Sequence, residues 1–384
     1  MFAEYLSRLE PSVAANRYES RRKKLLRALR KQKVDAILVT AEANVTWLTG
    51  FTGDSTWLLL TKANGILLSD TRYTTQIANE CSGQDLDVQV RDAGGTMLKT
   101  VTKVLKKAKV KNLGFESDSV SHAQWAGIAK ASDGTELVAT SGIIENLRAV
   151  KDKQEIVDIR LAVKLAERGM AALKAGLTAE MTEVQVAHDL EHAMRSFGAT
   201  RAGFDPIVAV GPNAALPHAH PGSRTIGENP VLLVDWGAET VSGNRSDLTR
   251  VLFTGNVSPK VEAVYGVVLK AQLAAIEAIR PGAACKDVDA IARGIIADAG
   301  YDKYFGHGLG HGFGLQIHEQ PRLSPISQQI LEPGMVVTVE PGIYLPGRFG
   351  IRIEDDILVT KTGFEVLSSL PKQFEESFVD ILTA

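Results

Sequence analysis

The sequence predicts an α/β domain at residues 1–147 followed by an α+β domain at residues 148–384. Apolar strand-like segments alternate with helical segments in the first part of the chain, as in layered α/β domains. A charged stretch around residues 145–152 leads into a long helical pattern, which is typical of a domain boundary. In the second part, a helix pair followed by strand-rich sequence occurs twice. We therefore expect a duplicated α+β domain with a site between its halves.

The first domain is expected to begin with a basic amphipathic helix at residues 15–33. The stretch from Arg17 to Lys33 carries nine lysine or arginine residues, and leucines occupy the opposite helix face. We interpret the basic residues as a solvated face, with nucleic-acid binding as the weaker alternative. The expected elements that follow are strands at residues 34–40, 56–61, 64–69, 86–92 and 111–117 and a helix at residues 97–108.

The second domain is expected to contain two helix pairs. In the first pair, a long helix at residues 156–176 precedes a helix that closes at Gly198. In the second pair, one helix ends near residues 280–282 and the next runs from near Asp287 to Gly300. Each pair leads into strand-rich sequence that contains acidic residues suited to binding metal.

Bulk composition favours a globular protein without affinity for nucleic acid or membranes. The chain has 384 residues, of which 45% are hydrophobic and 23% charged, and a net charge of −2. Cys81 and Cys285 stand alone without CxxC spacing, which indicates a reducing compartment. The beginning of the sequence lacks the apolar core of a signal peptide, and no apolar run approaches membrane length. We therefore expect a cytoplasmic protein.

Four carboxylates and one imidazole in the last third of the chain stand in apolar, glycine-rich contexts: Asp235, Asp247, His311, Glu340 and Glu354. Asp235 ends an apolar run and Asp247 opens the next one, which predicts a hairpin with both carboxylates at one cavity. Glu340 and Glu354 repeat this arrangement on two later strands. His311 lies between glycines that let the backbone approach a crowded site closely.

Several carboxylates gathered in a low-dielectric site repel one another or take up protons. Divalent cations neutralise such a cluster, and two cations that share bridging carboxylates fit this set of ligands. A carboxylate-rich set with one imidazole favours Mn²⁺, with Co²⁺ or Zn²⁺ as alternatives. Two ions roughly 3.5–4 Å apart hold one hydroxide between them and polarise the bond that it attacks. The five residues therefore predict a two-metal hydrolase.

A second histidine motif offers an alternative metal site. His188 and His192 enclose the pattern HxxEH, which is the inverted zinc-protease motif. However, Thr182 and Gln185 predict a capping box, and apolar residues recur with helical spacing. At 100° per residue the two histidines point away from that apolar stripe. We expect a solvated helix face here, with a single-zinc protease as the weaker alternative.

At these motifs the sequence resembles the pita-bread metallopeptidases, which include the Xaa-Pro aminopeptidases, the Xaa-Pro dipeptidases and, more distantly, the methionine aminopeptidases. The resemblance covers nearly the whole chain. Residues 44–53 and 68–76 look like the N-terminal domain of the Xaa-Pro peptidases, and the segments around His311 and Glu340 resemble their catalytic domain. The resemblance implies a creatinase/prolidase-like α/β N-terminal domain and an α+β pita-bread catalytic domain.

The same resemblance implies a role for each of the five ligands. Asp235 would bind one metal ion, and His311 and Glu340 would bind the other. Asp247 and Glu354 would bridge the two ions. Asp235 and Asp247 are separated by one residue more than is usual in the family, which we attribute to an extra residue in the hairpin loop.

Three histidines are implied to contact the substrate. His218 matches the family histidine near the scissile bond, with the neighbouring His220 as the less favoured choice. His318 would donate a hydrogen bond to the tetrahedral intermediate, and His307 would line the proline pocket. A purely structural histidine is the alternative for His307 and for His220.

Two arginines complete the implied site. Arg352 would orient a ligand carboxylate and lie at the substrate, and Arg322 matches an arginine that reaches toward the substrate C-terminus in the dipeptidases. Glu340 would pass a proton to the leaving nitrogen after the bridging hydroxide has attacked the carbonyl before proline. The resemblance thus implies a Xaa-Pro aminopeptidase or dipeptidase that acts on small peptides with proline in second position and forms a homodimer.

Two other functions are compatible with the fold. One is a metal-free hydrolase of the creatinase type, and the other is a catalytically silent module that binds peptides. Neither function requires the complete set of five metal ligands. Because all five are present, we favour the metallopeptidase.

Overall fold

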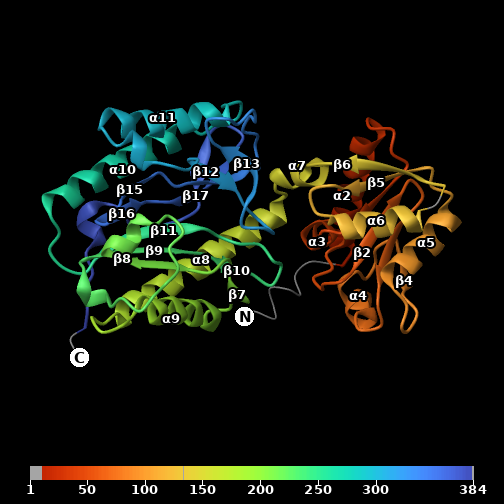
Figure 1. Cartoon of the computed structure of the whole chain (residues 1–384), viewed down its shortest axis with the longest axis horizontal. Coiled ribbons are helices and arrows are strands. Elements are labelled where there is room, and N and C mark those ends of the chain that lie inside the picture. Colours follow the sequence, from red (N-terminus) through yellow and green to blue (C-terminus); the bar gives the residue numbers. More distant parts are fainter. Residues whose placement is uncertain (1–10, 133, 383–384) are drawn as a thin grey trace. The chain divides into compact units, whose positions relative to one another are not determined.

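The computed structural model describes residues 11–132 and 134–382 of the chain. The chain forms two compact units, Met1–Arg148 and Ala149–Ala384 (Figure 1). Within the described residues, no helix combines the length and the apolar character needed to cross a lipid bilayer.

The first unit is built on one mixed sheet with the strand order β4-β3-β2-β1-β5-β6. The strands are β1 (Ala36–Val39), β2 (Trp57–Thr61), β3 (Gly65–Ser69), β4 (Leu86–Val90), β5 (Asn112–Glu116) and β6 (Glu136–Thr140). All five strands that the sequence predicts are confirmed. The sixth, β6, is an edge strand whose residues are mostly exposed or half-buried, so that it lacks a strong apolar signal.

Helix α2 precedes the first strand, α7 follows the last, and the other four helices alternate with strands in sequence: α2 (Pro11–Arg30), α3 (Glu42–Thr49), α4 (Thr74–Glu80), α5 (Met97–Ala108), α6 (His122–Ala131) and α7 (Ile143–Ala149). The helix predicted at residues 97–108 is confirmed as α5. Its N-terminus is capped by the side chain of Thr96, and its end is marked by Lys109 in a left-handed conformation. Val101 and Leu105 of α5 belong to the core cluster that also contains Leu38 of β1.

The basic residues of α2 are not all solvated, which corrects the interpretation of this helix. Arg21 and Arg22 each expose only 5% of their surface. Arg21 Nη1 donates to the carbonyl of Trp47 at 2.8 Å, and Arg22 Nη1 donates to that of Leu48 at 3.0 Å. Both carbonyls lie in the last turn of α3, where a helix leaves its C=O groups unpaired. The partner helix is distant in sequence, so local periodicity gives no sign of this contact.

The second unit contains two helix pairs with strands between them (Figure 1). The pairs confirm the predicted duplication of helix pairs and consist of α8 (Lys153–Gly176) with α9 (Glu183–Ser196) and α10 (Pro259–Glu277) with α11 (Cys285–Asp298). Each pair contributes to its own apolar cluster. Leu190 of α9 packs in one cluster with Trp236, and Val268 of α10 packs in the other with Val337.

The strands of the second unit form a three-stranded sheet, β11-β9-β8, and a five-stranded sheet, β13-β12-β14-β17-β18, with two small ribbons, β10-β7 and β15-β16. Their bounds are β7 (Arg201–Ala202), β8 (Ile207–Val210), β9 (Val231–Trp236), β10 (Ala238–Glu239), β11 (Leu248–Phe253), β12 (Gly310–Gly312), β13 (Glu319–Leu323), β14 (Val336–Val339), β15 (Gly342–Leu345), β16 (Phe349–Arg352), β17 (Asp355–Val359) and β18 (Phe364–Val366). An antiparallel bridge between Thr249 and Glu354 joins the two larger sheets.

Strand β12 lies too close to its neighbours to carry side chains on either side of His311. A Cβ atom on Gly310 would lie 2.1 Å from the carbonyl oxygen of Thr338. A Cβ atom on Gly312 would lie 2.1 Å from the carbonyl oxygen of Gln320. These oxygens belong to the backbone of paired strands and cannot move away without disrupting the sheet, so both positions require glycine. The expected close approach of the backbone at His311 is confirmed.

Helix α9 confirms that His188 and His192 occupy a solvated face. Thr182 caps the helix through the predicted capping box. Both histidines are exposed, and Glu191 accepts a hydrogen bond from Arg195 at 2.9 Å. The apolar stripe on the other side is buried and includes Val186, Leu190 and Met194.

Candidate active site

The hairpin of β9 and β11 positions the first two carboxylates. The strands pair antiparallel, with Asp235 opposite Thr249. Asp247 directly precedes β11, and both carboxylates are buried. The predicted hairpin is confirmed. Between its strands the chain passes through β10, which pairs with β7.

The strands β14 and β17 position the other two carboxylates in the same way. They pair antiparallel with Val339 opposite Asp355, so that Glu340 follows one strand and Glu354 precedes the other. The predicted repetition of the two-strand arrangement is confirmed. Thr249 Oγ1 donates to Glu354 Oε2 at 2.6 Å, which ties this pair of strands to the β9–β11 hairpin.

His311 on β12 has the tautomer of a metal ligand. Its Nδ1 lies 3.1 Å from the carbonyl of Gly312 and therefore carries the proton and donates. The free Nε2 faces Asp247 Oδ2 at 3.5 Å and Glu340 Oε1 at 3.4 Å. Burial, with His318 as a second cause, lowers the pKa of His311 to about 3, so the ring is neutral. A neutral imidazole whose other nitrogen is held by a carbonyl is the usual ligand state.

The structure brings all five predicted ligands together. One ligand atom each from Asp235, Asp247 and Glu354 lies within 4.8 Å of the other two. His311 Nε2 in turn lies between Asp247 and Glu340. Asp247 therefore belongs to both groups, and the five side chains form one continuous cluster.

The electrostatics of the cluster fit divalent cations. Burial raises the pKa of Asp247 and of Glu354, and the surrounding carboxylates raise both further. Burial also raises the pKa of Glu340 from 4.5 to about 8. In addition, Asp235 Oδ1 is buried and has no hydrogen-bond partner among the residues that the structure describes. Bound divalent cations would relieve the repulsion and satisfy this oxygen, and oxygen with one imidazole suits such ions.

Arg352 supports the cluster from outside. It is buried against Asp235, to which its Nη2 donates. Its Nε donates to Thr249 Oγ1 at 3.0 Å, and its Nη1 donates to the Tyr344 hydroxyl at 2.9 Å and to the carbonyl of Pro217 at 3.2 Å. Arg352 therefore fixes the orientation of Asp235 and of the Thr249 hydroxyl. A direct contact with substrate stays a prediction.

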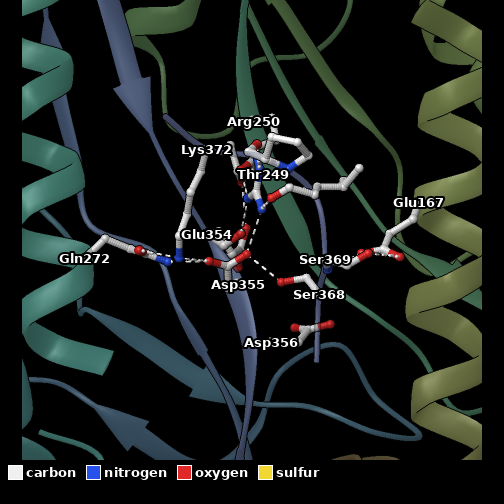
Figure 2. Close-up of polar contacts among 12 residues, drawn as sticks. Glu167, Thr249, Arg250, Gln272, Glu354, Asp355, Asp356, Ser368, Ser369 and Lys372 are labelled. Atoms are coloured by element: carbon white, nitrogen blue, oxygen red, sulfur yellow. Dashed lines mark hydrogen bonds and ion pairs between the residues drawn. The ribbon is translucent and has the colours of Figure 1, made fainter. Parts of the chain in front are cut away.

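A buried ionic cluster lies beside the backbone of Glu354 (Figure 2). Arg250 Nη1 donates to the carbonyl of Glu354 at 2.6 Å, and Arg250 Nη2 donates to Asp355 Oδ1 at 2.7 Å. Lys372 and Gln272 donate to the other oxygen of Asp355. Burial opposes ionisation of Asp355, but Arg250 and Lys372 outweigh it and hold its pKa below the ordinary value. The cluster thus anchors the strand that carries Glu354.

A cavity of about 440 Å³ is lined by four of the ligands and by every residue predicted to contact substrate: His218, His307, His318, Arg322 and Arg352. Phe204, Ile207 and Ile317 add apolar surface. His220, the less favoured alternative to His218, is exposed and is not part of this lining. The His318 ring lies edge-on to that of His311, with 4.5 Å between centroids.

His307 has internal partners on both ring nitrogens. Its Nδ1 lies 2.8 Å from the carbonyl of Gly308, and its Nε2 lies 2.9 Å from the Tyr344 hydroxyl. Burial, followed by the charge of Arg352, lowers its pKa to about 4, so the ring is neutral. Nδ1 therefore donates to Gly308, and Nε2 accepts from Tyr344. His307 is thus a satisfied histidine as well as a residue of the cavity wall.

Thr249, Tyr344 and Asp356 also support the site and were not predicted. Thr249 lies two positions after Asp247, and strand alternation alone places the two side chains on one face. Tyr344 links His307 to Arg352. Asp356 Oδ2 accepts the backbone N–H of Asp247 at 3.1 Å. The contacts of Tyr344 with His307 and of Asp356 with Asp247 join distant segments and leave no local signal.

Metal binding is expected to release protons at neutral pH. Without cations the pKa of about 8 keeps a proton on Glu340 at neutral pH, and a cation displaces it. Burial and the neighbouring carboxylates raise the pKa of Asp247 and of Glu354 in the same direction. The number released should fall as the pH rises through about 8, the pKa of Glu340. Calorimetric titration with Mn²⁺ in buffers of different ionisation enthalpy measures this number. A heat of binding that is independent of the buffer below that pH contradicts the expectation.

The raised pKa of Glu340 also determines how the stability of the metal-free fold changes with pH. Because the folded-state pKa of Glu340 lies above its ordinary value of 4.5, the metal-free fold binds this proton more tightly than the unfolded chain does. This contribution is fully present below pH 4.5 and is lost as the pH rises to about 8. The thermal stabilisation by added metal should therefore increase across that interval.

Comparison with known proteins gives consistent matches over both units. Residues 157–361 match the model of metallopeptidase family M24, and residues 21–150 match the creatinase/prolidase N-terminal domain. A protein of Pyrococcus horikoshii named Xaa-Pro dipeptidase is 33% identical over 352 residues, which are 91% of this chain and 97% of that relative.

Two solved structures are similar to this fold and belong to enzymes with different names. A Xaa-Pro dipeptidase from Bacillus anthracis has a TM-score of 0.88 at 36% identity, and the match covers 95% of this chain and all of that one. An X-Pro aminopeptidase from Thermotoga maritima has a TM-score of 0.83 at 34% identity, with 92% of this chain and all of that one covered. The predicted pita-bread catalytic domain with a creatinase-type N-terminal domain is thereby confirmed, and the chain belongs to metallopeptidase family M24.

Proposed function

We propose that the protein is a Xaa-Pro dipeptidase with two divalent metal ions, preferably Mn²⁺, in each chain. The observation that carries this proposal is the convergence of the five ligand residues in one cluster, four of which line a cavity that also holds three further histidines and Arg322. At about 440 Å³, the cavity lies toward the small end of the roughly 300–1,000 Å³ range of ligand pockets. Such a volume favours a small substrate.

The arrangement of the ligands supports the roles implied for them. Asp235 would bind one ion, His311 and Glu340 the other, and Asp247 and Glu354 both. Asp247 lies near Asp235 and Glu354 on one side and faces His311 on the other, as a bridging residue must. When bound, the cations would supply a nucleophilic water and polarise the carbonyl under attack.

The side chains around the cavity would carry the remaining steps. Glu340, whose pKa is raised by burial, would hold the proton taken from the attacking water and pass it to the proline nitrogen. His318 would donate a hydrogen bond to the developing oxyanion, and His218 would contact the substrate beside the scissile bond. His307 would line the proline pocket. Since proline's amide nitrogen carries no N–H, a pocket shaped for the ring selects the bond before it.

Arg322 favours dipeptides over longer peptides. It lies on β13, is exposed and lines the cavity. A guanidinium group there can pair with the free carboxylate of a dipeptide, which in a longer peptide is replaced by an amide. The similarity to the X-Pro aminopeptidase from Thermotoga maritima supports the second candidate, a Xaa-Pro aminopeptidase. A cytoplasmic location and the homodimer implied by the resemblance stay predictions.

An assay of paired substrates tests the proposal. With Mn²⁺ present, the protein is expected to hydrolyse Xaa-Pro dipeptides faster than Xaa-Pro-Xaa tripeptides, and a chelated sample should hydrolyse neither. Faster hydrolysis of tripeptides would establish the aminopeptidase instead. Creatine hydrolysis that is insensitive to chelator, or peptide binding without hydrolysis by metal-loaded protein, would contradict both.

Replacing Arg322 by methionine isolates the carboxylate contact. The variant is expected to show a raised KM for Xaa-Pro dipeptides and an unchanged KM for Xaa-Pro amides, which lack the carboxylate. An equal change for both substrates would show that Arg322 acts on the general shape of the cavity.

A further inference from the structure

Glu183, in the first turn of α9, is a buried acidic residue outside the metal cluster. Its exposed fraction is 0%, and amide N–H groups surround its carboxyl group. Both carboxyl oxygens accept hydrogen bonds. Oε1 accepts from the backbone of Val210 at 2.7 Å, and Oε2 accepts from that of Gly222 at 2.8 Å. The Asn213 side-chain amide donates to both oxygens, at 2.9 and 3.1 Å.

The two backbone partners of Glu183 mark the limits of one segment, residues 211–222, which we call the His218 segment; Val210 directly precedes it and Gly222 is its last residue. Val210 is also the last residue of β8. The carboxyl group of Glu183 therefore holds the two ends of the segment together. His218, which lies within the segment, lines the cavity. Closing a loop in this way removes conformational freedom from every residue between its ends.

The same segment is held at the cavity by the residues of the active site. Arg352 donates to the carbonyl of Pro217, which directly precedes His218. At its beginning, the segment packs against β16 so tightly that a Cβ atom on Gly350 would lie 1.8 Å from the carbonyl of Ala214. His218 thus lies on a segment that is fixed by Arg352 on the cavity side and by Glu183 at its base.

The hydrogen bonds of Glu183 require a carboxylate group. Each oxygen accepts one backbone N–H, so both ends of the side chain must be acceptors. A glutamine of the same size would place its NH₂ group against the N–H of Val210 or of Gly222 and lose one end of the segment. A buried N–H without an acceptor is costly, so the segment would shift to find another partner.

We propose that Glu183 is a positioning residue, which acts on the substrate through His218 by fixing the His218 segment. This inference rests on the proposed function, because it requires that His218 contacts the substrate. Glu183 itself lines no part of the cavity. A displacement of about 1 Å at a catalytic side chain lowers the rate on the order of 10²-fold, even when the altered residue is remote.

A double-mutant cycle tests the proposal. Glu183→Gln, His218→Ala and the double variant are compared in kcat, KM and Mn²⁺ affinity on Xaa-Pro dipeptides. Glu183→Gln is expected to lower kcat/KM on the order of 10²-fold and to leave Mn²⁺ affinity unchanged. In the His218→Ala background the same substitution should have almost no further effect, because residues that act through one another are not additive. Glu180→Gln, at an exposed position just before α9, is the matched control and should match the unmodified protein.

The outcomes separate this inference from the proposed function. Additive losses from the two substitutions, or an unchanged kcat/KM in Glu183→Gln, would show a purely structural role and overturn the inference alone. Full activity in His218→Ala would remove the assigned role of His218 and overturn the inference with it. If Glu183→Gln does not fold, Asn213→Ala gives a milder form of the same cycle, since it removes one donor from each carboxyl oxygen.

Discussion

Replacing Glu354 by alanine is expected to abolish measurable hydrolysis of Xaa-Pro dipeptides and to lower the metal content of the protein. Glu354 supplies a ligand atom within 4.8 Å of those of Asp235 and Asp247, and in the proposed centre it binds both ions. Its loss should therefore exceed the roughly 10–100-fold effect of removing an outer partner of a metal ligand. Atomic absorption for the metal and kcat/KM for the activity check both parts.

His188→Ala is the control for that experiment. His188 lies on the exposed face of α9, so its removal should change neither activity nor metal content. Loss of activity in this variant with an intact fold would revive the zinc-helix alternative. Retained activity in Glu354→Ala would contradict the two-metal proposal.

Replacing Arg250 by methionine should lower the free energy of unfolding by about 3 kcal/mol, the lower end of the range for breaking a buried ion pair. Arg250 is buried, and it holds both the carbonyl of Glu354 and the carboxylate of Asp355. Its removal leaves Asp355 paired with Lys372. Urea unfolding of the metal-free protein, which avoids the contribution of bound metal, measures the loss.

Lys372→Met provides the comparison for Arg250. The Lys372 side chain is 17% exposed, against 5% for Arg250, and its pairing with Asp355 is correspondingly better screened by solvent. We expect a smaller loss of stability in this variant. A loss equal to that of Arg250→Met would show that the charge of Asp355, rather than the anchoring of Glu354, dominates.

The strands of the active site were predictable because their signal is local. Asp235 and Glu340 each end a run of buried apolar residues, and such runs appear in the sequence as strands. The alternation of side chains along these strands then indicates which side chains face the site. The capping box at Thr182 is an equally local signal, and it predicted where α9 begins. The helical spacing of the apolar residues then placed His188 on the exposed face.

The contacts that support the ligands were not predictable in this way. Arg21 donates to a carbonyl in another helix, and Arg250 donates to a strand more than a hundred residues later in the sequence. Glu183 appears in the sequence as an ordinary acidic residue in the first turn of a helix. Its burial depends on the course of a segment that no periodicity describes. These residues are defined by tertiary packing, which a single sequence does not contain.

The glycines beside His311 limit how this region can be redesigned. Neither Gly310 nor Gly312 has a side chain to offer a substrate, yet backbone oxygens occupy the space where any side chain would begin. A combinatorial library over β12 would therefore recover the native residue at all three positions. At His311 the selection would reflect chemistry, and at its two neighbours it would reflect volume alone. Equal intolerance to substitution at the three positions would therefore not mean that all three take part in the chemistry.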